Sequence, residues 1–437
     1  MEINAKEAAH IIKKQSNKIS DSDELHQYSK EELIEKIKSL QSHNMQLRNI
    51  IAKSSSKQMG KQCKKVQKPF DFTTCTFRHV LLKFMYIGWD YQGYAVQEDT
   101  TNTIENYLFE ALIKTCLIKN RNSSNYHRCG RTDKGVSSFG QVISIDLRSR
   151  LSKDQQDDIN SEINYCNTLN KVLPENIQCI AWCPVDDDFS ARFNCKSRTY
   201  KYFFPRDNLN IENMQIAAQY LIGTHDFRNF CKMDVGNGVI QFVRNILSIE
   251  LSPSTRVCDK EDYNLYVATI KGQAFLWHQI RCIMGVLLLI GQGKEEPEIV
   301  KELLNIEKNP RKPDYNMASE VPLNLYYCEY DSSREWIYDY TSLSTVIQKL
   351  KTQWTFSSIK STMIEYMLHD VEAIHNSLKS NKIEKPNNIN YLLSGVKSKN
   401  YIPLMKRQKC ESLEDRIEHY VKKKKLEISE EAIKSSN

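Results

Sequence analysis

The sequence predicts an α+β fold built on a mostly antiparallel sheet. Segments with the alternating pattern of strands outnumber strand–helix–strand units in the central part of the chain, which favours antiparallel pairing. With 437 residues, of which 40% are hydrophobic, the chain is long enough for two or three domains with a sizeable core. Charged residues make up 26% of the chain, which indicates that polar extensions accompany this core.

Composition divides the chain into four parts. They are a polar N-terminal extension (1–75), two successive halves of a folded body (76–185 and 186–332) and a charged helical C-terminal extension (333–437). In the first part, Ser29 and Glu32 have the spacing of a capping box. The helix that follows (29–52) carries a short heptad seam with a lone Asn44 at an a position, which specifies register in parallel coiled coils. This coiled-coil helix either pairs with a partner or packs on the body, and a Ser/Lys-rich linker follows it.

The first half of the body mixes strands and helices. Periodicity predicts strands at 79–87, 141–147 and 178–182, and helices at 103–118 and 163–173. Asn102 and Glu105 stand at capping spacing at the start of the first helix, and Pro174 stops the second.

The second half continues the same mixture. Strands are predicted at 198–204, from Gly238, at 263–271 and at 321–330, and helices at 211–222, 275–290 and 297–305. Arg198, Tyr200 and Tyr202 lie on one face of the first of these strands, because side chains alternate along a strand. An Asn-Gly turn signal at Asn237 predicts that the second and third strands form a hairpin.

A glycine-hinged basic loop at 126–136 carries a single carboxylate, Asp133. Gly130 and Gly135 bracket the loop, and glycine adopts positive φ without steric cost. Three cations near Asp133 favour its ionised form, and an ionised, oriented carboxylate acts as a nucleophile or general base. These cations are Arg128, Arg131 and Lys134. The alternative is a solvated polar turn in which Asp133 binds only its own backbone.

The apolar helix 275–290 places Arg281 on a face that the sequence predicts to be buried. A buried arginine needs a carboxylate partner, because losing the partner costs about 3–5 kcal/mol. Two acids are candidates, Asp133 and Asp226.

Charge and composition limit the class of protein. Between residues 119 and 150 seven Lys/Arg stand against two acids, with Tyr126, His127 and Phe139 interleaved. This stretch is either an RNA surface or a solvated basic face. The net charge of +7 is compatible with nucleic acid, and the lysine run at 422–425 is a nuclear-localisation or RNA-contact patch or a solvated helix end.

The remaining signals point to an intracellular protein without a bound group. The N-terminus lacks a signal core, and the longest apolar run, 282–290, is too short to span a bilayer. The 13 cysteines form no C-x-x-C pair, so we expect reduced thiols and neither a disulfide frame nor a metal site. The Gly-x-Gly-x-x-Gly, P-loop and His-Glu-x-x-His signatures of nucleotide and zinc-protease sites are absent.

Four blocks in the body occur in the order seen in the TruA family of tRNA pseudouridine synthases, which this chain resembles. They are Gly130–Val136, Phe189–Phe193 leading into Arg198–Tyr202, Gly223–Phe227 and Phe275–Arg281. Three flanking stretches, 86–94, 124–129 and 401–407, resemble the eukaryotic branch that modifies uridines 38 and 39 of the tRNA anticodon arm. The chain departs from bacterial members at Tyr94–Gln97, where they usually have Gly-Trp-Gln.

The resemblance implies a fold, an activity and a site. The fold is two ferredoxin-like halves that share one extended sheet, with a central basic cleft, in a homodimer that needs no cofactor. The expected activity is isomerisation of uridine to pseudouridine in tRNA, located in the nucleus, the cytoplasm or both. A non-catalytic RNA-binding protein on the same fold, and the same chemistry at other tRNA uridines, are the alternatives.

Site residues follow from the matched motifs. Asp133 is implied as the essential carboxylate, paired with Arg281, while Tyr200 borders the flipped uracil and Arg131 holds the phosphate backbone. Whether Asp133 attacks the ribose, attacks the uracil ring or abstracts a sugar proton is left open. Further substrate contacts are expected from Lys134, Arg128, Tyr126, His278 and Arg198.

Overall fold

A computed structural model of the protein describes residues 70–155, 158–235, 239–254, 264–331, 335–378, 392–393 and 400–422. The predicted coiled-coil helix at 29–52, the linker after it, the Asn237 turn signal and lysines 423–425 lie outside these residues. All elements below belong to one compact unit, Asp71–Asn437.

The described residues form a nine-stranded sheet in the order β4-β1-β3-β9-β5-β8-β7-β6, with β2 also paired to β3. The strands are β1 (Thr76–Tyr86), β2 (His127–Arg128), β3 (Ser137–Ser149), β4 (Ile177–Pro184), β5 (Ser197–Pro205), β6 (Gly223–Asp226), β7 (Val243–Pro253), β8 (Leu265–Gly272) and β9 (Leu323–Glu329). Within the described ranges every pair is antiparallel except β3 with β9. The predicted α+β class with a mostly antiparallel sheet is therefore confirmed.

The parallel β3–β9 pair joins the two antiparallel parts of the sheet. Only two register pairs make it, Ser137 opposite Asn324 and Ser138 opposite Leu325. The Ser138 hydroxyl also donates to the Leu325 carbonyl at 2.7 Å. A Cβ at Gly140 would lie 2.5 Å from the Tyr326 carbonyl oxygen, so this close approach of two backbones requires glycine.

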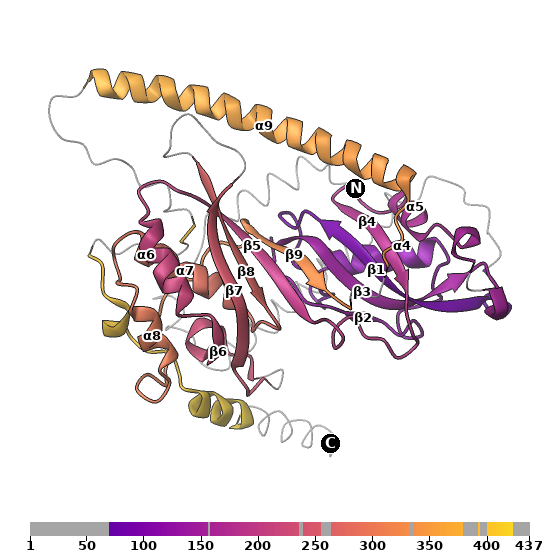
Figure 1. The fold of residues 1–437 in the computed structure, drawn as a ribbon, viewed down its shortest axis with the longest axis horizontal. Coiled ribbons are helices and arrows are strands. Elements are labelled where there is room, and N and C mark those ends of the chain that lie inside the picture. The colour runs from indigo at the N-terminus through magenta and orange to yellow at the C-terminus, as the bar shows by residue number, and fades with distance from the viewer. Residues whose placement is uncertain are drawn as a thin grey trace, which may run out of the picture. The chain divides into compact units, whose positions relative to one another are not determined.

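Six labelled α-helices of the described residues pack around the sheet, and a further helical segment covers residues 413–422 (Figure 1). The labelled helices are α4 (Ile104–Lys114), α5 (Tyr165–Asn170), α6 (Ile211–Gln219), α7 (Gln279–Gly291), α8 (Ile299–Leu304) and α9 (Tyr340–Ser377). Helices α4 and α5 pack on β1 through one core cluster, because Leu108 and Leu112 repeat every fourth residue. Helices α6 and α7 share a second cluster with β5, β7 and β8.

Helix α7 is the most deeply buried element of the second core. All 13 of its residues, Arg281 among them, are buried. Because α7 is buried on all sides, it has no face towards solvent, and neighbouring side chains fix its position. This rigidity matters for function, since the N-terminal end of α7 contributes to the site described below. No helix among the described residues combines the length and the apolar character needed to cross a membrane.

The start of helix α7 differs from the prediction. The helix begins at Gln279 and not at Phe275, because His278 has a φ of +61° that lies outside helical geometry. Trp277 and His278 therefore sit on a turn before the helix.

Two other predicted boundaries are also corrected. Helix α4 is capped by Thr103, whose side chain accepts from the Asn106 N–H, and not by the Asn102–Glu105 pair. Glu105 is instead buried and binds distant cations. The predicted strand at Gly238 begins later, at Val243 of β7, although β7 and β8 do pair antiparallel as expected.

Helix α9 begins the C-terminal extension, which the sequence predicted to be helical. Its first turns pack on β4 and α5, where the Ser342 hydroxyl accepts from Asn170 at 2.9 Å and Lys349 donates to Gln178 at 3.0 Å. In Figure 1 the helix runs along the upper edge, starting beside α5 and β4. Beyond Gln353 its large apolar side chains are exposed.

Candidate active site

The loop that carries Asp133 lies immediately before β3, next to the β3–β9 junction. Three contacts to the end of β1 and the segment after it hold the loop. The Thr132 carbonyl accepts from the Tyr94 N–H at 3.1 Å, and the Tyr91 carbonyl accepts from the Gly135 N–H at 3.2 Å. The Thr132 and Tyr86 hydroxyls lie 2.7 Å apart. These contacts fix the loop backbone on both sides of Asp133.

The two loop glycines have different roles. Gly135 has a φ of +78°, and a Cβ there would lie 2.8 Å from the Cγ of Glu320. Gly130 does not have positive φ, and a Cβ there would meet nothing within 4 Å. The prediction that both glycines provide left-handed conformations is thus wrong for Gly130, and the loop turns at Gly135.

Three side chains from the start of α7 surround the Asp133 carboxylate. The Trp277 indole N–H donates to Oδ1 at 3.2 Å. On the other oxygen, Oδ2 lies 3.4 Å from His278 Nε2 and 4.0 Å from Arg281 Nη1. The long-range approach of Arg281 to Asp133 was predicted from the sequence, whereas the Trp277 contact was not.

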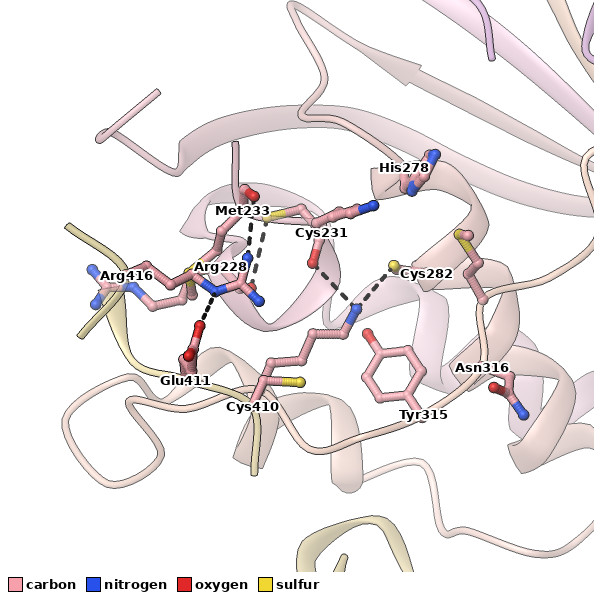
Figure 2. A pocket seen from close by; sticks show the side chains of 13 residues that line it. Arg228, Cys231, Met233, His278, Cys282, Tyr315, Asn316, Cys410, Glu411 and Arg416 are labelled. Atoms are coloured by element: carbon pink, nitrogen blue, oxygen red, sulfur yellow. Dashed lines mark hydrogen bonds and ion pairs between the residues drawn. The ribbon is translucent and has the colours of Figure 1, made fainter. Parts of the chain in front are cut away.

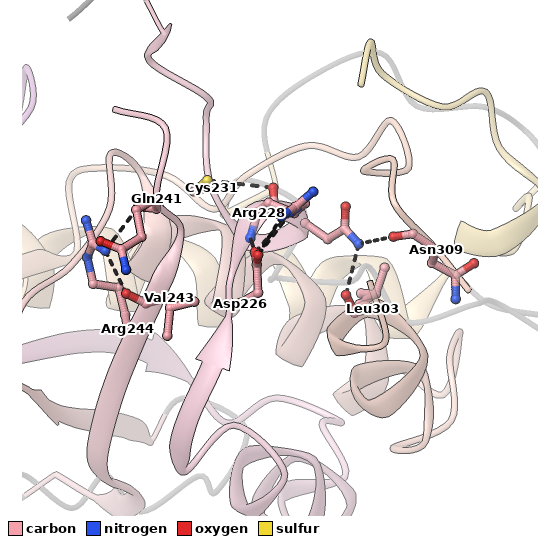
Figure 3. Close-up of polar contacts among 9 residues, drawn as sticks. Asp226, Arg228, Cys231, Gln241, Val243, Arg244, Leu303 and Asn309 are labelled. Carbon is pink, nitrogen blue, oxygen red and sulfur yellow. Dashed lines mark hydrogen bonds and ion pairs between the residues drawn. The ribbon is translucent and has the colours of Figure 1, made fainter. Parts of the chain in front are cut away.

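Arg281 has a second and closer carboxylate partner. Its Nη2 donates to Glu320 Oε2 at 2.7 Å and its Nε donates to the Ala318 carbonyl at 2.8 Å. Asp226, the other candidate considered from the sequence, binds Arg228 at 2.7 Å (Figure 3). Arg281 therefore bridges Asp133 and Glu320, and no spacing in the sequence points to Glu320.

Burial and neighbouring charge set the protonation of the site. Burial raises the pKa of Asp133, while the Arg281 guanidinium and the Trp277 N–H oppose that rise. Burial, with Arg281 and Lys232 nearby, lowers the pKa of His278 to about 4. His278 is therefore neutral near pH 7, and Arg281 supplies the positive charge beside Asp133.

His278 stands between two hollows. One is a smaller pocket of about 240 Å³, shown in Figure 2, in which Lys312 donates to the Cys231 carbonyl and to Cys282 Sγ. The other is a cleft of about 1230 Å³ on the Asp133 side. His278 Nδ1 is buried and has no hydrogen-bond partner among the described residues. The larger cleft is the candidate active site.

All nine predicted site residues line this larger cleft. They are Tyr126, Arg128, Arg131, Asp133, Lys134, Arg198, Tyr200, His278 and Arg281. Tyr200 is half-buried on β5, with its ring edge-to-face against Phe275 at 5.2 Å, and burial raises its pKa. Its phenol is therefore protonated across the neutral range. Arg131 and Lys134 are exposed at the mouth.

Two of these cations and one ring are held by protein groups. Arg198 donates to the carbonyls of Cys129 at 3.2 Å and Arg192 at 2.9 Å, so it organises backbone at the cleft wall. The buried Glu105 accepts from Arg128 at 2.6 Å and from the Tyr126 hydroxyl at 2.7 Å. Sequence reasoning missed Glu105 as an organiser because its position looked like a helix cap.

Comparisons with known proteins show which family this chain resembles. A sequence model of the family described as tRNA pseudouridine synthase matches residues 217–331, which include α7 and Arg281. The tRNA pseudouridine(38/39) synthase of Bos taurus is 48% identical over 389 residues, which cover 83% of this chain and 81% of the relative. That of Saccharomyces cerevisiae is 41% identical and covers 69% of this chain and 71% of its own length.

A more distant relative matches a smaller share of the chain. The tRNA pseudouridine synthase A of Methanosarcina mazei is 32% identical over 267 residues, which are 60% of this chain and 89% of the relative. Similarity thus extends from relatives that match along most of their own length to a more distant protein that matches 60% of this chain. The chain belongs to the TruA family of tRNA pseudouridine synthases, a family of isomerases.

Proposed function

We propose that this protein converts uridines 38 and 39 of the tRNA anticodon arm into pseudouridine, with Asp133 as the catalytic carboxylate. The relatives that match along most of their length carry those two positions in their names. The observation that carries the assignment of Asp133 is its place in a cleft, held at once by Trp277, His278 and Arg281.

The reaction is an isomerisation. The N1–C1′ glycosidic bond breaks, the uracil turns, and C5 bonds to C1′ while the C5 proton leaves to solvent and N1 takes up a proton. A carboxylate with one oxygen fixed by the indole N–H and the other facing a cation is pre-oriented for this chemistry. Tyr200, protonated and half-buried on the same cleft, borders the turning base.

The lining of the cleft suits an RNA backbone. Nine Lys/Arg line it against three acids, Asp133, Asp234 and Glu320. The cations are Arg121, Arg128, Arg131, Lys134, Arg192, Arg198, Lys232, Arg244 and Arg281. Extruding a nucleotide costs a few kcal/mol, which contacts from exposed cations such as Arg131 and Lys134 offset. We propose that this is a basic cleft between two ferredoxin-like halves, 76–185 and 186–332.

The test is Asp133→Asn, which keeps the shape of the side chain and removes the charge. Tritium release from tRNA labelled as 5-³H-uridine is expected to fall by at least about 10³-fold, because no other group of the site replaces the carboxylate. Binding of tRNA should stay within a few-fold of wild type. Release at the wild-type rate would disprove the catalytic role of Asp133.

Mapping pseudouridines in tRNA from cells lacking this chain tests the target positions. Loss of the modification at positions 38 and 39 is expected, while loss at other uridines would assign the same chemistry to a different substrate set. In cells, we propose that the protein acts in the nucleus, the cytoplasm or both.

We also propose that the protein is a homodimer that pairs through helix α9. Among its 38 residues only Ser342 and Val346 are buried. Large apolar side chains are exposed on the rest of the helix, including Trp354 (66%), Ile364 (65%) and Val371 (62%). Exposed large apolar side chains gathered on one helix are typical of an interface between chains.

A further inference from the structure

Three cysteine thiols from distant parts of the chain meet beside the Asp133 loop. Cys129 lies in the first part of the loop, Cys195 precedes β5, and Cys328 lies on β9. Their Sγ atoms all lie within 4.8 Å of one another, and those of Cys129 and Cys328 are 3.4 Å apart. The three residues are 4%, 8% and 4% exposed. This cluster has no role in the chemistry described above.

The separation of the thiols fits a single metal ion. Zinc bonds to thiolate sulfur at about 2.3 Å in a tetrahedral arrangement, which places sulfur atoms roughly 3.7 Å apart. The three Sγ atoms lie within 4.8 Å of one another. Small side-chain rotations would bring them to the spacing of zinc-bound sulfur atoms. No other group of three or more potential ligands is this compact in the described part of the chain.

A cation is already in place to balance the charge of such a site. Three thiolates around Zn²⁺ carry a net charge of −1, and a buried net charge is costly unless it is compensated. The Arg198 guanidinium donates to the carbonyls of Cys129 at 3.2 Å and Cys195 at 3.4 Å. It also interacts electrostatically with all three thiols. One guanidinium and one zinc tris-thiolate together are neutral.

We propose that Cys129, Cys195 and Cys328 bind one Zn²⁺ ion and fill three of its four ligand positions. Binding exchanges three S–H protons, which pass to solvent, for three Zn–S bonds, with no oxidation or reduction. An all-sulfur ligand set selects a soft or borderline cation and disfavours Mg²⁺ and Ca²⁺. The expectation of no metal site rested on the absence of paired cysteines, and this cluster is assembled from segments 66 and 133 residues apart.

The ion would connect three segments that support the active site. Cys129 is four residues before Asp133, Cys195 is three residues before Arg198, and Cys328 is three residues after Leu325 of the β3–β9 junction. Zinc would therefore stabilise the base of the Asp133 loop against β9. Its role is positioning, since Cys129 borders the cleft but is only 4% exposed, and Cys195 and Cys328 do not line it.

Elemental analysis of the full chain tests the proposal. The protein is produced in zinc-supplemented medium and purified without a polyhistidine tag or chelating resin. Wild type is expected to hold about one zinc ion per chain. Cys195→Ala and Cys328→Ala should each lose it. The control is Cys166→Ala, because Cys166 and Cys179 are also buried and 3.2 Å apart but have no third thiol.

A second measurement keeps the test valid if a variant fails to fold. Wild type stripped of zinc and loaded with Co²⁺ should show the sulfur-to-cobalt charge-transfer absorption of thiolate ligands. The stripped chain should also melt at a lower temperature, since the ion binds only the folded state. Wild type that neither contains nor takes up Zn²⁺ would overturn the proposal, as would zinc retained by a folded Cys195→Ala variant.

Discussion

The carboxylate of Asp133 has three neighbours on one short segment, and each acts on it differently. Arg281 supplies charge at 4.0 Å, His278 is neutral and lies at 3.4 Å, and Trp277 donates a directional hydrogen bond at 3.2 Å. Lys232 lies 4.4 Å from the Trp277 ring and helps to hold it. At the scale of single residues, orientation of the carboxylate therefore comes from Trp277 and charge comes from Arg281.

Trp277→Phe removes the hydrogen bond to Asp133 and keeps an aromatic ring. We expect kcat to fall about tenfold with little change in KM, which corresponds to one lost hydrogen bond to a charged group. The Trp277 N–H lowers the pKa of Asp133, so the acidic limb of the pH–rate profile should move to higher pH. Trp89→Phe is the control, since the Trp89 indole donates only to the Val321 carbonyl at the surface. An unshifted acidic limb in Trp277→Phe would contradict this role.

His278 makes a separate prediction about stability. Its pKa of about 4 lies below the usual 6.5, so the unfolded chain binds a proton between these values and the folded chain does not. The stabilisation is fully present above pH 6.5 and is lost as the pH falls towards 4. Between pH 7 and pH 5 this loss amounts to about 2 kcal/mol.

Urea unfolding at the two pH values checks the effect. Wild type should lose about 2 kcal/mol more than His278→Asn between pH 7 and pH 5, and asparagine tolerates the positive φ at this position. His419→Asn, which removes an exposed imidazole, should follow wild type. Equal pH dependence in wild type and His278→Asn would show that His278 does not titrate as described.

At the scale of elements, the Asp133 loop and the turn before α7 are both fixed to rigid parts of the fold. The loop is fixed by backbone contacts to Tyr91 and Tyr94, and the turn is fixed by the fully buried helix that follows it. Because both segments are anchored to rigid structure, the backbone positions Asp133 and its partners, and side-chain contacts add to this. Glu320, just before β9, meets both segments, since it binds Arg281 and packs under Gly135.

Gly135→Ala tests this arrangement. The positive φ and the 2.8 Å approach to Glu320 predict a loss of about 1–3 kcal/mol of stability and slower tritium release. Gly130→Ala is the matched control in the same loop, and its stability should stay within about 0.5 kcal/mol of wild type. Urea unfolding and single-turnover assays measure both. Equal effects of the two substitutions would mean that the loop does not depend on Gly135.

At the scale of the whole molecule, helix α9 exposes large apolar side chains that a single chain leaves uncovered. Only its first turns pack on the body, yet it continues for 38 residues, about 57 Å, with apolar side chains exposed. Large apolar side chains exposed along one helix usually mark a surface that other structure covers. A second chain is the partner that this surface suits under the homodimer proposal.

Ile364→Asp tests the pairing. A charge in the middle of the apolar surface is expected to convert a dimer into a monomer, because burying it unpaired costs several kcal/mol. Ser357→Asp, which places the same charge at an exposed polar position of the same helix, should remain dimeric. Light scattering after size-exclusion chromatography gives the mass directly. A wild type that is monomeric at micromolar concentration would remove α9 as a dimer interface.

Much of the fold was predictable because its information is local. The fourfold repeat of Leu108 and Leu112 in α4, and the alternation of Arg198, Tyr200 and Tyr202 in β5, follow from one stretch of chain each. Boundaries shifted where local geometry overrode periodicity, as at His278, whose left-handed backbone makes the helix start later than predicted. The resemblance of four blocks also placed Asp133, Arg281 and Tyr200 on one site before any geometry was available.

The sequence by itself determined the fold class, most elements and the family, because periodicity and motif order are properties of neighbouring residues. Only the tertiary structure decided which charges meet. Glu320 rather than Asp226 partners Arg281, Glu105 organises Arg128, and Trp277 orients Asp133. Each of these contacts joins residues at least 23 positions apart in the chain. Their distance is set by the order of strands in the sheet and by how a buried helix begins, and no spacing along the sequence encodes either.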